Sequence, residues 1–184
     1  MLEFKEKIDA LPQDNSAHEG QKLILYAFIR SMKPEKVVEI GTHIGVTALY
    51  LAHALFDNKK GHLWTCDPYD YKQEETFNKF PELKEYITFE KKKGQDLNID
   101  KIDFLFIDGF HEKDYVLAEI KALFPRLTKE AVVFFHDAGG DNAYVGVNEA
   151  IREAGLKTLM IAGEGKMRLY CNYENFYFDT INPK

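Results

Sequence analysis

The side chains that could do chemistry in this sequence are carboxylates and imidazoles that follow apolar runs. Carboxylates stand at or just after the ends of five such runs: Glu39, Asp67, Asp96, Asp108 and Asp137. A carboxylate in that place can accept hydrogen bonds from ribose hydroxyls, and two that lie close together repel unless a cation or a proton lies between them. The pattern therefore indicates a cofactor cradle with a charged centre beside it.

A glycine-containing turn follows the first of these runs. Gly41 and Gly45 are separated by three residues and precede a helical pattern, which is typical of a strand, a tight turn and a helix beneath a ligand. His43 stands where a dinucleotide fingerprint needs glycine, and no Gly-Lys-Ser/Thr follows, so the cofactor is expected to be a nucleoside without a pyrophosphate. S-adenosylmethionine fits. Plain turn geometry is the alternative for both glycines, and a turn or helix cap is the alternative for Asp67.

The elements that would position these residues alternate between strands and helices. We expect seven strands: Val37–Gly41, His62–Cys66, Tyr86–Glu90, Ile102–Ile107, Ala131–Phe135, Lys157–Ala162 and Met167–Cys171. We expect helices over residues 2–11, Gln21–Arg30, Val46–Phe56, a short part of Tyr69–Lys84, Lys113–Phe124 and Tyr144–Ala154. Continuous apolar runs indicate strands covered on both faces. The sequence thus predicts an α/β fold: a doubly wound, mostly parallel seven-stranded sheet, with helices on both faces and a C-terminal antiparallel hairpin around Gly163–Gly165.

Composition narrows the class of protein. The 184 residues predict a single domain, 1–184, with a short N-terminal helical cap over 1–33 and a cofactor-binding core over 36–171. The net charge is −6, the pI is about 5.5, and no basic cluster exceeds Lys91–Lys93, so a nucleic-acid partner is not expected. There is no signal-peptide pattern or membrane-spanning run. Cys66 and Cys171 are expected as reduced thiols in a cytoplasmic protein.

Several motifs together resemble one family. The sequence resembles the class I S-adenosylmethionine-dependent methyltransferases, and within them the small metal-dependent O-methyltransferases, which include catechol, caffeoyl-CoA and macrolide-sugar enzymes. The motifs that carry the resemblance are Glu39–Thr47, Ile107–His111, Phe135–Asp137, Gly146–Ile151 and Ser16–Gln21. Because these motifs occur together and in the family's order, their combined signal is stronger than that of any one alone.

The resemblance implies roles for residues around the cofactor. Glu39 and Gly41, with Gly45 in the same turn, would lie at the methionine part, and Asp67 would bind the ribose. The other cofactor residues that the resemblance implies are Gln95 and Asp96 at the adenine amino group, Phe110 against the adenine ring, and Asp108. An apolar slot with one or two acceptors suits adenine.

The same resemblance and the chemistry of the side chains predict a metal site and a base. Asp108 and Asp137 would leave neighbouring strands about 4.8 Å apart and hold a divalent cation with His136. Mg²⁺ is favoured for oxygen ligands, whereas the nitrogen of His136 makes Mn²⁺, Fe²⁺ or Zn²⁺ more plausible than oxygen ligands alone would. His111 would be the general base, with Asp108 beside it. The alternatives are a structural histidine at a helix start for His111, and a buried histidine in the sheet for His136.

The predicted function is metal-dependent O-methylation of a small hydroxylated acceptor, a sugar or a phenol. Two alternatives stay open: a metal-independent or N-directed methyltransferase, and a non-catalytic domain that binds S-adenosylmethionine. A nucleotide-dependent oxidoreductase is disfavoured by His43. The expected partner is a small-molecule acceptor, without nucleic acid or membrane. The short N-terminal cap suggests either an open, shallow acceptor site or one that a second subunit completes, and we predict a homodimer. The aromatic segment 172–184 could add an edge strand or an interface.

Overall fold

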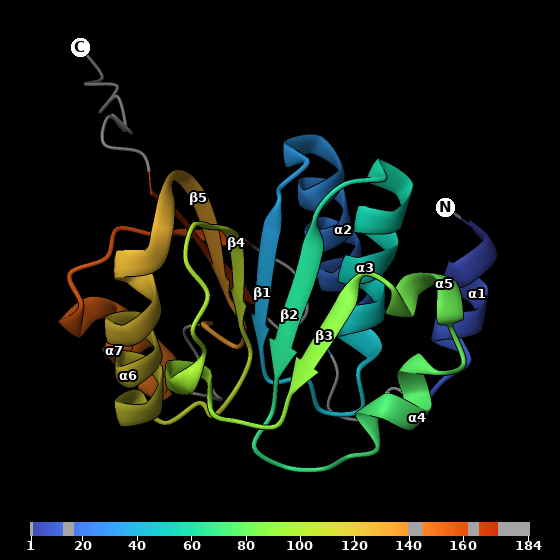
Figure 1. Cartoon of the computed structure of the whole chain (residues 1–184). Helices are drawn as coiled ribbons and strands as arrows, with labels where there is room; N and C mark the ends of the chain where they lie inside the picture. The colour runs from blue at the N-terminus through green and yellow to red at the C-terminus, as the bar shows by residue number, and fades with distance from the viewer. Residues whose placement is uncertain (1, 13–16, 140–144, 162–165, 173–184) are drawn as a thin grey trace.

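The computed structural model describes residues 2–12, 17–139, 145–161 and 166–172, and its centre is a seven-stranded sheet (Figure 1). The strands are β1 (Lys36–Ile40), β2 (His62–Cys66), β3 (Ile87–Glu90), β4 (Ile102–Ile107), β5 (Leu127–Phe135), β6 (Leu159–Ile161) and β7 (Met167–Cys171). Their order across the sheet is β3-β2-β1-β4-β5-β7-β6. Strands β1 to β5 pair in parallel, whereas β7 is antiparallel to both β5 and β6. The predicted fold class and the antiparallel C-terminal pair are therefore confirmed.

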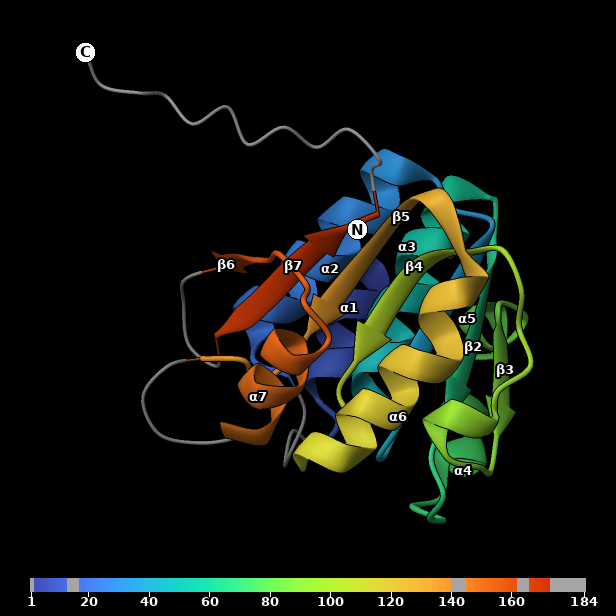
Figure 2. The same cartoon turned by 90° about the vertical axis from the view of Figure 1, so that its left-hand side faces the viewer.

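Helices cover both faces of this sheet. The helices are α1 (Leu2–Asp9), α2 (Glu19–Met32), α3 (Val46–Asn58), α4 (Gln73–Phe77), α5 (Pro81–Lys84), α6 (Lys113–Leu123) and α7 (Val145–Glu153), with short 3₁₀ turns η1 (Gly94–Asp96) and η2 (Phe124–Arg126). Figure 1 shows α1, α2 and α3 on one face, and Figure 2 shows α6 and α7 together on the other. Successive side chains along a strand point to opposite faces of the sheet. Because the central strands carry apolar side chains on both faces, each face is covered by helices.

The buried side chains form one apolar layer on each face of the sheet. On β4, Phe104 and Phe106 pack with the α1–α3 layer, whereas Leu105 and Ile107 pack with the α6–α7 layer. Because both faces of the strand are buried, its sequence reads as a continuous apolar run. Burial of both layers fixes the register, and with it the positions of the residues that follow each strand.

Four strands differ from the prediction in their bounds. Strand β1 is Lys36–Ile40 rather than Val37–Gly41, β3 begins one residue later than predicted, and β5 and β6 differ by more. Strand β5 begins at Leu127 instead of Ala131, because Lys129 and Glu130 are exposed and carry no hydrophobic signal. Strand β6 is reduced to Leu159–Ile161 at the edge of the sheet. The predicted hairpin turn Gly163–Gly165, the helix start Tyr144, Ser16 of the N-terminal motif and the aromatic tail from Tyr173 onward lie outside the described residues.

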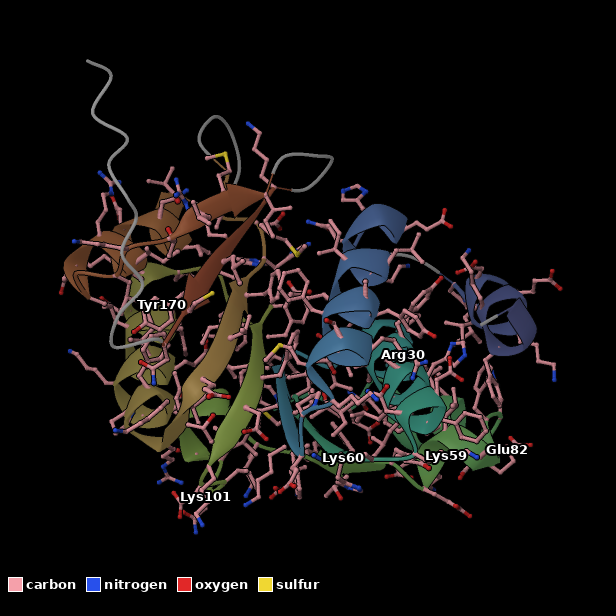
Figure 3. All side chains as sticks on the ribbon, turned by 90° about the horizontal axis from the view of Figure 1, so that it is seen from above. Arg30, Lys59, Lys60, Glu82, Lys101 and Tyr170 are labelled. Atoms are coloured by element: carbon pink, nitrogen blue, oxygen red, sulfur yellow. The ribbon has the colours of Figure 1, made fainter. Side chains whose placement is uncertain are left out.

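The topology reverses between β1 and β4, and this is where the site lies. From β1 the sheet continues through β2 to β3 on one side and from β4 to β5 on the other, and such a switch point opens a crevice at the carboxyl ends of the strands. Arg30, Lys60 and Lys101 lie at the opposite end of the sheet, towards the viewer in Figure 3. None of the helices in the described ranges combines the length and the apolar character that crossing a membrane requires.

Candidate active site

A cavity of about 370 Å³ lies at this switch point. Its walls are the loops that follow β1, β2 and β4, together with the segment at η1 and one side of α6. The predicted site residues that line it are Gly41, Asp67, Gln95, Asp108, Phe110 and His111. The cavity volume is that of a small-molecule or cofactor site.

The turn after β1 requires glycine for two different reasons. Gly41 has a φ of +92°, and a Cβ built on it would lie 2.0 Å from the carbonyl oxygen of Asp108, so no side chain fits between the ends of β1 and β4. Gly45 has a φ of +95° at the start of α3, and a Cβ there would lie 2.6 Å from the ring of Phe77. Gly41 therefore allows the close approach of two loops at the cavity, whereas Gly45 packs away from it.

Asp67 connects the two loops that flank the cavity on the β2 side. Its Oδ2 accepts a hydrogen bond from the backbone N–H of His43 at 2.9 Å, and its Oδ1 accepts one from the N–H of Tyr69 at 2.9 Å. The side chain is buried but lines the cavity. Because each carboxylate oxygen can accept more than one hydrogen bond, Asp67 retains acceptor capacity towards a ligand.

Glu39 lies beneath the turn and does not line the cavity. It is fully buried, and its Oε2 accepts a hydrogen bond from Thr65 Oγ1 at 2.5 Å, while Thr42 donates to Thr65 at 2.6 Å. Its Oε1 has no hydrogen-bond partner among the described residues. Burial, with the charges of Asp108 and Asp67, raises the pKa of Glu39 to about 8 against the effect of the Thr65 hydrogen bond.

The predicted adenine end of the cavity contains Gln95 and Phe110. Gln95 lines the cavity, and its Oε1 is buried without a hydrogen-bond partner in the described part of the chain. Phe110 packs against Tyr115 with ring centroids 4.9 Å apart and meets Tyr69 edge-on at 6.1 Å. Asp96 is exposed and is not among the lining residues. The structure thus brings Gln95 and Phe110 to the cavity and leaves Asp96 outside it.

A cluster of carboxylate and imidazole side chains lies where β4 and β5 end, at the edge of the cavity. His136 Nδ1 is 2.7 Å from Asp108 Oδ1, and His111 Nε2 is 3.5 Å from the same oxygen. Asp108, His111 and His136 each offer one ligand atom, and these three atoms lie within 4.8 Å of one another. Asp137 is close, with its Oδ2 3.5 Å from His136 Nδ1 and 3.8 Å from His111 Nε2, but is not part of that group.

The charges in this cluster stabilise one another. Burial alone would raise the pKa of Asp108, but the charge of His136, with that of His111 beside it, outweighs burial and lowers the pKa. Burial alone would lower the pKa of His136, whereas the nearby Asp108 carboxylate raises it. The cluster therefore holds an ionised carboxylate against imidazole, a donor set that can bind a proton or a cation.

Gln21 orients His136, and the sequence did not reveal this role. Its Oε1 lies 3.0 Å from His136 Nε2 and also accepts the backbone N–H of His18 at 2.8 Å. With Nε2 donating to Gln21, the Nδ1 atom of His136 faces Asp108. The sequence does contain a sign of it: Gln21 is a polar residue on the helix face that carries the apolar Leu25 and Ile29, four and eight residues further along.

Glu119 on α6 lines the cavity and is a second residue of the site that the sequence did not reveal. Only 2% of it is exposed, and it lines the cavity beside Gly94 and Gly109. The signal was again a polar residue on an apolar helix face, here with Val116, Ile120 and Leu123.

Solved structures with the same fold include several methyltransferases. An S-adenosylhomocysteine-bound methyltransferase from Podospora anserina is 16% identical, with a TM-score of 0.71, over 94% of this chain and 86% of that one. An O-methyltransferase from Bacillus cereus in complex with S-adenosylhomocysteine is 15% identical, with a TM-score of 0.70, over 92% and 89%. A TDP-rhamnose 3′-O-methyltransferase of calicheamicin biosynthesis is 15% identical, with a TM-score of 0.67, over 92% and 86%. At these identities the likeness is one of fold.

Sequence comparison identifies the family. No curated protein matches the chain in a direct comparison. The profile of the family described as "Methyltransferase domain" matches residues 38–138, which is more than half of the chain and spans the strand ends that line the cavity. The chain therefore belongs to this methyltransferase family, and the predicted membership of the S-adenosylmethionine-dependent methyltransferases is confirmed.

Proposed function

We propose that the protein transfers the methyl group of S-adenosylmethionine to an oxygen of a small hydroxylated acceptor, a sugar or a phenol, with the help of a divalent cation. The observation that carries this proposal is the convergence of Asp108, His111 and His136 beside the cavity. The names of two solved structures with this fold, an O-methyltransferase and a TDP-rhamnose 3′-O-methyltransferase, support oxygen as the acceptor atom.

The cofactor would lie along the cavity with its ribose at Asp67. The turn that contains Gly41 and Gly45, held from below by Glu39, would receive the methionine part, with Asp108 beside it. At the other end Phe110 would lie against the adenine and Gln95 would meet its amino group, whereas the exposed Asp96 lies outside the cavity. In this orientation the sulfonium would point towards the cluster of Asp108, His111 and His136.

The residues of the cluster fit a divalent cation. Three ligand atoms within 4.8 Å of one another could reach a common ion, and the ion would neutralise a carboxylate that otherwise relies on imidazole. Asp108, His136 and a third residue, either Asp137 or His111, would hold the ion. With Asp137 as the third ligand the set has two carboxylates and one imidazole, and Mg²⁺ is favoured. With His111 the set has two imidazoles and one carboxylate, and Mn²⁺ or Fe²⁺ would be preferred. The ion would supply Lewis acidity that lowers the pKa of an acceptor hydroxyl.

The residues of the chain would position the acceptor and remove its proton. Methyl transfer is an in-line displacement, so the acceptor oxygen, the methyl carbon and the sulfur must lie nearly in line. His111 would take the proton from the acceptor oxygen at Nε2, and Asp108, 3.5 Å away, would stabilise the imidazolium that forms. If His111 instead binds the ion, the base would be Asp137, whose Oδ2 lies 3.8 Å from His111 Nε2 in the same cluster.

An activity assay with a chelator tests this function. The purified protein is incubated with labelled S-adenosylmethionine and panels of sugar nucleotides, phenols and amines, with Mn²⁺ or with excess chelator. We expect methylation of a hydroxyl acceptor that the chelator abolishes and Mn²⁺ restores. Turnover that resists the chelator would favour the metal-independent alternative, and methylated amines would favour an N-directed enzyme. Tight cofactor binding without turnover on any panel would favour the non-catalytic alternative.

The remaining predictions concern the whole chain. We propose one domain over 1–184, in which 1–33 form the cap and 36–171 the cofactor-binding core, and a cytoplasmic location with neither nucleic acid nor membrane as partner. We also propose a homodimer that completes the acceptor site. Light scattering at micromolar concentration tests the dimer, and a monomeric mass there would contradict it.

A further inference from the structure

Glu119 places a carboxyl group at one end of the cavity. The residue is 2% exposed, and its Oε1 lies beneath two backbone segments: a Cβ built on Gly94 would be 3.0 Å from this oxygen, and one built on Gly109 would be 3.2 Å from it. Gly94 opens η1 and Gly109 follows β4, so the carboxyl group lies where the two loops meet over α6. The absence of side chains on both glycines lets the two backbone segments approach the carboxyl group and Ile40 closely.

The carboxyl group has no partner within the described ranges that would explain its burial. Its Oε2 is buried and forms no hydrogen bond there, and an unsatisfied polar group of this kind destabilises a fold unless a ligand or water completes it. Burial raises the pKa of Glu119 to about 8, so the group is neutral at pH 7. A neutral carboxyl group offers one hydrogen-bond donor and one acceptor, whereas a carboxylate only accepts.

The groups around Glu119 indicate which kind of ligand would fit the cavity. Gln95 lines the same cavity and carries a second acceptor, its buried Oε1, that has no hydrogen-bond partner in the described part of the chain. Phe110, Tyr115 and Ile40 supply apolar surface there. A flat ring with polar groups on its edge suits such a slot, and adenine presents a 6-amino donor next to the N1 acceptor. A neutral carboxyl group pairs with both atoms, whereas a carboxylate would face the N1 lone pair.

We propose that Glu119 recognises the adenine of the bound cofactor, its carboxyl group accepting from the 6-amino group and donating to the adjacent ring nitrogen while Gln95 accepts the second amino hydrogen. This assignment rests on the proposed function, because it requires an adenosyl cofactor in the cavity. It makes a residue of α6, in addition to Gln95 in η1, responsible for recognising the adenine base.

The test measures binding of S-adenosylhomocysteine by calorimetry to the wild type, Glu119→Gln and Glu119→Leu. The glutamine side chain keeps one acceptor and a donor, so its Kd should stay within about 3-fold of the wild type, whereas leucine should weaken binding by about 10- to 100-fold. The analogue with hydrogen in place of the 6-amino group should bind the wild type about 10-fold more weakly but should lose much less on the leucine substitution. Equal losses for both ligands would overturn the proposal.

Two further readouts separate recognition from a structural role. Glu119→Leu removes an unpaired buried carboxyl group, so its unfolding temperature without ligand should equal or exceed that of the wild type while its affinity falls. The wild-type affinity should also fall as the pH rises above about 8, and Glu119→Gln should lose this part of the pH dependence. Cys66 on β2 interacts electrostatically with Glu119, and the titratable groups Lys93, ahead of η1, and Tyr115, on α6, line the same cavity; all three remain in both variants.

The outcomes distinguish this proposal from the proposed function. If the wild type does not bind S-adenosylhomocysteine at all, the proposed function fails. If the wild type binds it and Glu119→Leu binds it equally well, only the assignment of Glu119 fails. If the leucine variant is unfolded, the comparison of Glu119→Gln across pH decides, and a pH dependence identical to that of the wild type contradicts the proposal.

Discussion

Asp108 and His136 lie side by side although 28 residues separate them in the sequence, with Asp108 Oδ1 2.7 Å from His136 Nδ1. The register of the sheet produces this contact: Ile107 pairs with Phe135, and the N–H of His136 donates to the carbonyl of Ile107 at 2.9 Å. The residues that follow β4 and β5 are therefore held by backbone hydrogen bonds rather than by a flexible loop. A site built this way is pre-organised for a ligand.

Asp108→Asn tests the charge of the cluster. The amide keeps the shape of the carboxyl group but removes the negative charge that raises the pKa of His136. We expect loss of most Mn²⁺ affinity, and of methyl transfer by a factor of at least about 100, measured by calorimetry and by turnover. Asp137→Asn identifies the third ligand: its Mn²⁺ affinity should stay near that of the wild type if Asp108, His111 and His136 hold the ion, and should fall if Asp137 holds it with Asp108 and His136. Unchanged Mn²⁺ affinity in Asp108→Asn would rule out this cluster as the metal site.

Gln21→Leu tests the orientation of His136. The substitution removes the acceptor that binds His136 Nε2, so the imidazole should sample other orientations and metal affinity should fall by about 10- to 100-fold. Gln73→Leu is the matched control. Gln73 is a buried glutamine on α4 that hydrogen-bonds the backbone of Tyr69 and Tyr71, so its loss should affect stability but not metal affinity. Equal metal affinity in the two variants would contradict a positioning role for Gln21.

Gly41→Ala tests the contact between the loops that follow β1 and β4. The new Cβ would overlap the carbonyl oxygen of Asp108, and the positive φ adds about 1–3 kcal/mol of backbone strain. We expect a loss of stability above about 3 kcal/mol, measured by urea unfolding. Gly20→Ala on α2 is the control: a Cβ there meets nothing within 4 Å, and alanine should stabilise the helix by about 0.5–1 kcal/mol. A Gly41→Ala protein as stable as the wild type would show that the two loops can separate.

Glu39→Gln tests the pH dependence of stability. The folded protein keeps a proton on Glu39 up to about pH 8, whereas the unfolded chain loses it above about pH 4.5. The free energy of unfolding should therefore decrease between these pH values, by an amount on the order of a few kcal/mol. The glutamine variant should be more stable than the wild type at pH 8 and equal to it at pH 4, in urea titrations. Because the pKa of Glu119 is also raised, the Glu39→Gln variant should keep part of the wild-type decrease in unfolding free energy with pH. A slope identical to that of the wild type would contradict a buried, protonated Glu39.

The sequence predicted the fold because the buried strands are its most apolar segments. Strands β2, β4 and β7 have the predicted bounds. For β4 the reason is that a strand buried on both faces is a continuous apolar run. The first residues of β5 were missed because Lys129 and Glu130 are exposed, so their pairing is determined by neighbouring strands rather than by their own polarity.

The site was predictable where a residue's place along the chain determines its place in space. Asp67 and Asp108 follow parallel strands, whose carboxyl ends necessarily lie at one edge. Gln21 and Glu119 lie on helices, and which turn of a helix reaches the cavity depends on how the helix packs against the sheet. Asp96 illustrates the converse: it follows a strand closely in sequence, yet the η1 turn directs Gln95 to the cavity and leaves Asp96 exposed.

Calorimetric titration with S-adenosylhomocysteine tests most directly whether this cavity is the cofactor site. We compare the wild type with Asp67→Asn, which removes the charge from the strand-end carboxyl group proposed to bind the ribose, and with Glu75→Gln, an exposed residue on α4. The account predicts saturable binding by the wild type and by Glu75→Gln, and binding at least about 10-fold weaker by Asp67→Asn. No binding by the wild type at millimolar ligand, or equal affinity in all three proteins, would contradict it.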